Sequence, residues 1–164
     1  MDDKNLYASP QADVDVDNTG KLASRSVRLL GAIIDGLVAT LIITPAMYFS
    51  GYFQRAMEDS ISLFDVAFWP VFGVAVYIAL NGYLLATSGQ TIGKRIVGTR
   101  IVSVEDGKIL PFSKVIMLRV LPFTVLAQVP GVGPFAGIAN VLFIYGPQRR
   151  CLHDYLAGTR VVET

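Results

Sequence analysis

Three ionisable residues lie inside stretches of this sequence that are otherwise apolar. Arg28 and Asp35 belong to the first apolar stretch, and Arg119 belongs to the third. A charged side chain that faces lipid is energetically costly, so such residues usually turn toward other helices and find partners there. Their positions therefore indicate a polar centre that could bind or conduct a charged solute.

Asp35 and Arg119 form the ion pair that the sequence predicts first. Each lies about eight residues into its helix from the same side, which is a depth of roughly 12 Å at helical rise. Arg28 is a second candidate partner for Asp35, because a spacing of seven residues places both on one helix face. The alternative is a purely structural role, in which these charges only hold helices together.

The composition indicates that these residues lie in a bilayer. Hydrophobic residues make up 52% of the 164 residues and charged residues only 16%, with a mean hydropathy of +0.50. Soluble domains carry about a quarter charged residues, because a water-facing surface needs them. We therefore predict an integral membrane protein that is all-α apart from a small β element.

Four apolar segments are predicted to cross the membrane. The first two are close to the roughly 20 residues that a crossing needs. The third apolar region is too long for one crossing, and the Pro- and Gly-rich residues 130–134 would break a helix there. The predicted crossings are residues 27–49, 66–86, 111–129 and 132–147. An alternative places residues 111–129 at the membrane interface and leaves three crossings.

Basic residues predict the orientation of these helices. Lys and Arg accumulate on the cytoplasmic side, and they are frequent before the first helix, in the loop 87–110 and after the last helix. Both termini are thus predicted to lie in the cytoplasm. A cytoplasmic C-terminus requires an even number of crossings, which favours four.

The first 22 residues differ from the rest of the chain. Residues 1–22 are polar and acidic and contain no apolar core, so they do not form a secretory signal peptide. Their composition is typical of a disordered tail. The membrane domain is therefore predicted to cover residues 23–164.

A short pattern occurs twice in the basic regions. The sequence GTRIV at residues 98–102 recurs as GTRVV at residues 158–162. Each half would then contain two helices, a basic turn and a strand, which is consistent with a parallel repeat. If the repeat holds, the two strands pair at the cytoplasmic surface and the first extends into a hairpin at residues 105–108.

Several other functions find no support in the sequence. Residues 89–95, GQTIGKR, resemble a phosphate-binding loop, but they are one residue short and lack Ser or Thr after the Lys. There is no nucleophile elbow, so no enzyme and no cofactor are predicted. One Cys and one His, His153, are too few for a dedicated metal site. The basic loop is better explained by anionic lipid than by nucleic acid.

The pattern of charges resembles the RDD family of bacterial membrane proteins. Arg28 and Asp35 are followed by GQTIGKRIVGTRIV at 89–102, by Arg119 and by RRCLHDYLAGTRVV at 149–162. The family is named for an arginine and two aspartates, which the motif matches to Arg28, Asp35 and Asp154. The similar region covers about residues 23–162, and its cytoplasmic motif contains Gln90, Gly93, Lys94, Arg95 and His153.

The resemblance implies a place in the bacterial inner membrane and a transport function, without naming a ligand. Members are described as transporters of unknown ligands, and some resemble cation/proton antiporters. The family is usually drawn with three crossings, whereas the basic C-terminus favours four here. On this basis a symmetric oligomer is expected, since four helices are few to enclose a pathway.

The predicted function is that of a small multi-pass transporter with a centre built from Arg28, Asp35, Arg119 and Asp154. Asp35 would respond to a small cation or to protons. The alternative is a non-transporting scaffold or accessory subunit, whose cytoplasmic surface docks a protein partner or anionic lipid.

Overall fold

The computed structural model describes residues 20–127, 132–146 and 148–164. Most of these residues are helical, and two short strands form one sheet. Residues 1–19 of the predicted disordered tail lie outside the described residues. Residues 20–22 are described and pair with the C-terminal strand, so they belong to the fold.

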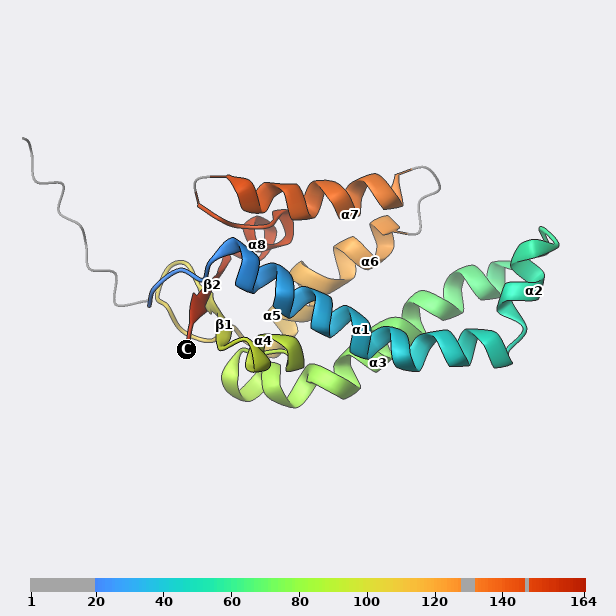
Figure 1. Cartoon of the computed structure of the whole chain (residues 1–164), viewed down its shortest axis with the longest axis horizontal. Coiled ribbons are helices and arrows are strands. Elements are labelled where there is room, and N and C mark those ends of the chain that lie inside the picture. Colours follow the sequence, from blue (N-terminus) through green and yellow to red (C-terminus); the bar gives the residue numbers. More distant parts are fainter. Residues whose placement is uncertain (1–19, 128–131, 147) are drawn as a thin grey trace, which may run out of the picture.

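Two long helices dominate the molecule. Helix α1 covers Arg25–Phe49 and helix α3 covers Leu63–Ser88, and both are long and apolar enough to cross a membrane. Ser24 caps α1, and a reciprocal capping box of Ser62 and Asp65 begins α3. The short helix α2, Tyr52–Met57, connects them at the end of the molecule opposite the sheet (Figure 1).

The second pair of helices is described in short pieces. Helix α5, Phe112–Val115, continues through a π-helical segment, η1, Ile116–Val120, into α6, Leu121–Ala127. Helix α7, Gly133–Leu142, ends in the 3-10 turn η2, Phe143–Tyr145.

The lengths of these helices are compatible with either two or four membrane crossings. The 10 residues of α7 cover about 15 Å, which is half of a hydrocarbon core of about 30 Å. Four crossings are therefore not confirmed, because only α1 and α3 have the required length among the described residues. The predicted break at residues 130–134 lies partly outside them.

The predicted pairing of the two GTR strands is confirmed. Strand β1, Thr99–Ser103, pairs antiparallel with β2, Thr159–Glu163, and Ile101 faces Val161. The start of the described chain adds to this sheet, since Ala23 N–H donates to the Val161 carbonyl at 3.1 Å. Both ends of the described chain thus meet at one end of the molecule, the sheet end (Figure 1). Two crossings satisfy this geometry as well as four.

The recurrence in the sequence is also a recurrence in structure. Helix α4, Ile92–Ile96, and helix α8, Leu152–Ala157, are each followed within two residues by a glycine with positive φ, Gly98 at 66° and Gly158 at 63°. Each glycine leads directly into a strand, and glycine is favoured because other residues are strained in this region. Ile101 and Val161 are equivalent in the two units and opposite in the sheet, so a local two-fold axis passes between them.

Candidate functional site

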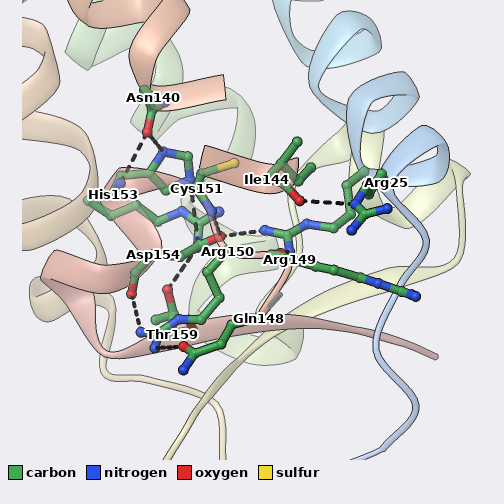
Figure 2. Close-up of polar contacts among 12 residues, drawn as sticks. Arg25, Asn140, Ile144, Gln148, Arg149, Arg150, Cys151, His153, Asp154 and Thr159 are labelled. Atoms are coloured by element: carbon green, nitrogen blue, oxygen red, sulfur yellow. Dashed lines mark hydrogen bonds and ion pairs between the residues drawn. The ribbon is translucent and has the colours of Figure 1, made fainter. Parts of the chain in front are cut away.

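A fully buried carboxylate organises the charges at the sheet end. Asp154 accepts hydrogen bonds from the Arg28 guanidinium, from Arg119 Nη1 at 2.6 Å and from Thr159 Oγ1 at 3.1 Å. The Cys151 N–H also donates to it, at 3.1 Å (Figure 2). Three elements far apart in the sequence, α1, η1 and α8, are thereby held at one point.

The arginines keep Asp154 ionised. Burial alone would raise the pKa of Asp154, but Arg119, His153 and Arg28 outweigh it and hold the pKa well below its usual range. The group of Arg28, Arg119 and Asp154 carries a net positive charge, because one carboxylate faces two guanidinium groups. Both arginines and Asp154 were predicted members of the charge centre, and the structure places them together.

The predicted ion pair between Asp35 and Arg119 is wrong. The Asp35 carboxylate accepts from Thr91 Oγ1 at 2.5 Å and from the Gly93 N–H at 2.7 Å, whereas Arg119 bonds to Asp154. Arg28, the second candidate partner, also goes to Asp154. Asp35 therefore ties α1 to the first turn of α4, where free N–H groups need acceptors.

The close approach of α1 and α4 depends on a glycine, Gly93. A Cβ atom on Gly93 would lie 2.1 Å from the Gly31 carbonyl oxygen and 2.9 Å from Cγ of Asp35. No real Cβ tolerates such contacts, so the backbones can meet only because residue 93 is glycine. This explains the second glycine of the GQTIGKR segment in terms of packing and not of phosphate binding.

The remaining residues of the cytoplasmic motif have different surroundings. Gln90 is buried and its Nε2 donates to the Thr99 carbonyl at 2.9 Å, which fixes the start of β1. Arg95 is exposed on α4. Lys94 is only 9% exposed and lies next to the charge centre.

Two asparagines fix the short helices. Asn81 Oδ1 on α3 accepts from the Ile92 N–H at 2.8 Å, and Asn140 Oδ1 on α7 accepts from the His153 N–H at 3.1 Å. The Nδ1 of His153 lies 2.8 Å from the same Asn140 oxygen (Figure 2). Burial and then Arg119 lower the pKa of His153 to about 3, so the ring is neutral at pH 7.

An open pocket of about 290 Å³ connects the two charged groups. We call it the charged pocket, and its polar lining consists of Asp35, Tyr77, Thr91, Lys94, Arg119 and His153. Tyr77 and Thr91 were not among the predicted site residues. Nothing in the sequence marks Tyr77, whereas Thr91 lies inside the GQTIGKR segment.

One group of side chains has the spacing of metal ligands. Ligand atoms of Cys151, His153 and Asp154 lie within 4.8 Å of one another. Both Asp154 oxygens are held by arginines, and these guanidinium groups would repel a cation. The group therefore does not fit a metal ion, whose ligands must offer free lone pairs.

Comparison with known proteins identifies the family. A family model described as the RDD family matches residues 22–158, far more than half of the chain. The chain belongs to the RDD family. Of the three residues that the sequence resemblance matches to the family's name, Arg28 and Asp154 bond to each other here, while Asp35 makes a different contact.

One curated relative of this RDD protein is a membrane protein of Bacillus subtilis (strain 168), described as uncharacterized membrane protein YteJ. The two are 29% identical over 103 residues, which is 61% of this chain and 56% of the relative. The matched region thus covers little more than half of the relative. No solved structure matches this chain. Family membership and the two long apolar helices identify it as a membrane protein.

Proposed function

We propose that this RDD protein is a small transporter of the bacterial inner membrane, in which a charged solute binds in the charged pocket. The observation that carries the proposal is the pocket itself, where Asp35, Lys94 and Arg119 line one space beside two helices that can cross a membrane. Ionisable groups retained among apolar helices typically belong to solute pathways. The basic residues that flank α1 and α8 support a cytoplasmic sheet end.

The transporter would act as an oligomer. Large apolar side chains on α1, α3 and α7 are exposed, among them Leu41, Val71 and Phe135. Lipid covers part of such a surface, but so few helices do not enclose a pathway alone, and a symmetric assembly would complete it. Exchange of a cation or proton at Asp35, which the family resemblance suggests, stays a prediction.

Flux across vesicles that contain the purified protein tests the proposal. We expect the wild type to conduct ions or protons and Asp35→Asn to lose most of this flux. Asparagine keeps an acceptor oxygen for the Gly93 N–H, so the contact between α1 and α4 can survive while the charge is lost. Asp106→Asn, in the exposed turn after β1, is the matched control and should conduct normally.

Unchanged flux in Asp35→Asn would remove Asp35 from the mechanism. Absence of any flux in the wild type would remove transport itself.

A second candidate, a membrane scaffold, is favoured by the hydrogen bonds and ion pairs that Arg28, Asp35 and Asp154 make within the protein. Each of these side chains joins separate elements of the fold, which is also what a purely structural role requires. A scaffold would dock a protein or anionic lipid on the sheet end. A stoichiometric partner that is lost in Arg95→Glu, a change at an exposed position of α4, together with absent flux, would select this candidate over the transporter.

A further inference from the structure

We infer that the charged pocket takes a phosphate-type oxyanion, with the Lys94 ammonium as its principal contact and Arg119 beside it. The inference rests on the proposed function, because it names the solute class of the same pocket. The anion could be free inorganic phosphate or the phosphate of a lipid headgroup, since both offer the same acceptor oxygens.

The charge balance around the pocket leaves one positive charge over. Arg28, Lys94 and Arg119 line the pocket or the cavity beside it and supply three cations. Asp35 in the lining and Asp154, which bonds to both arginines, supply two carboxylates. His153 is neutral at pH 7, as described above. Burial and then Arg119 lower the pKa of Lys94 to about 8, so its ammonium group is still mostly protonated at pH 7. Excess buried charge is unfavourable unless a counterion joins it.

The excess charge belongs to Lys94. Among the described residues, no carboxylate lies within 4.0 Å of its ammonium group, because Asp154 bonds to two arginines and Asp35 bonds to Thr91 and Gly93. The side chain is nevertheless more than nine-tenths buried. It lines both the charged pocket and a neighbouring cavity of about 60 Å³, and the carboxylates of Asp35 and Asp154 act on its charge only through space.

The donors around this space suit an oxyanion and not a cation. An ammonium group has three hydrogens to donate, and a guanidinium group donates in a fixed plane that matches phosphate oxygens. Tyr77 contributes a hydroxyl group to the same lining. The Asp35 oxygens, the natural ligands for a cation, already accept two hydrogen bonds.

Equilibrium binding of radiolabelled inorganic phosphate to lipid-free protein in neutral detergent tests the inference. Lys94→Met should weaken binding by about 10- to 100-fold, the usual effect of losing a charge-assisted hydrogen bond. Lys108→Met is the matched control, because Lys108 is exposed and lies 3.8 Å from Asp106, away from the pocket. This control should bind phosphate like the wild type.

Thermal unfolding without phosphate separates a lost ligand contact from a lost fold. Lys94→Met should unfold at the same temperature as the wild type or a higher one, because it removes an unpaired buried charge. Phosphate should then raise the unfolding temperature of the wild type but not of the variant. A variant that unfolds earlier than the wild type without phosphate, or that keeps the phosphate effect, would overturn the inference.

Vesicles distinguish the two sources of the anion. If the ligand is a lipid headgroup, phosphatidylglycerol in phosphatidylcholine vesicles stabilises the wild type but not Lys94→Met, and inorganic phosphate adds nothing. If the ligand is free phosphate, the ion stabilises the wild type in phosphatidylcholine alone. If neither phosphatidylglycerol nor inorganic phosphate stabilises the protein in a way that depends on Lys94, the inference is contradicted.

The binding and flux measurements test the anion site and the transporter separately. Phosphate or lipid binding that depends on Lys94, without any flux, would retain the anion site and remove the transporter. Flux without any binding that depends on Lys94 would retain the transporter and remove the anion site.

Discussion

Asp154→Asn is expected to lower the free energy of unfolding by about 3–5 kcal/mol, the usual loss when one partner of a buried ion pair is removed. Asparagine fits the same space, but it leaves the buried guanidinium groups of Arg28 and Arg119 without their shared counter-charge. Chemical unfolding in a neutral detergent measures the change. Asp106→Asn, on an exposed turn, is the control and should change stability by less than about 0.5 kcal/mol.

Partial rescue would show that charge and not volume is responsible. Adding Arg119→Met to Asp154→Asn should recover part of the loss, because the two residues are in direct contact and their effects are not additive. The pKa of Asp154 is lowered in the folded state, so its contribution is present above its ordinary value of 3.8 and disappears only in stronger acid. A loss below about 1 kcal/mol would contradict this account of the centre.

Gly93→Ala is expected to cost about 3 kcal/mol of stability, at the upper end of overpacking effects. The added Cβ would overlap the Gly31 carbonyl oxygen, which is backbone and cannot rotate away. Helices α1 and α4 would have to separate, and the bond from the Gly93 N–H to Asp35 would break. Thermal unfolding of the purified variant measures the loss.

Gly36→Ala is the matched control for this substitution. Gly36 lies on α1 close to Asp35, and a Cβ atom there meets nothing within 4 Å. Alanine is favoured over glycine inside a helix by about 1 kcal/mol, so this variant should be as stable as the wild type or more stable. Equal losses in the two variants would show that close helix packing at residue 93 is not the reason for glycine.

Hydropathy and recurrence predict the large features of the fold. The apolar runs predict α1 and α3, because a run long enough to cross a membrane identifies a helix whatever residues pack against it. The repeated GTR pattern gives the strand pair, since two similar β-prone segments at one surface can form a common sheet. The short helices α4 and α8 could not be predicted, because residues distant in sequence, Asp35 and Asn140, complete their first turns.

The partners of the charged residues were harder to predict. The predicted pair of Asp35 and Arg119 depended on equal depths in two regular helices. Arg119 lies instead in the π-helical segment η1, whose wider turn changes the direction of the side chain. The sequence also predicts a positively charged partner for Asp35, whereas a hydroxyl group and a backbone N–H donate hydrogen bonds to its carboxylate instead. Neither the π-segment nor the choice of neutral donors has a signature in the sequence.

The order in which the ribosome makes this chain delays the closure of its centre. Arg28 is synthesised 126 residues before Asp154, the carboxylate that it finally contacts. The guanidinium group of Arg28 therefore has to wait for its carboxylate partner until α1, α3 and η1 have all been made, and the sheet end assembles after the two long helices.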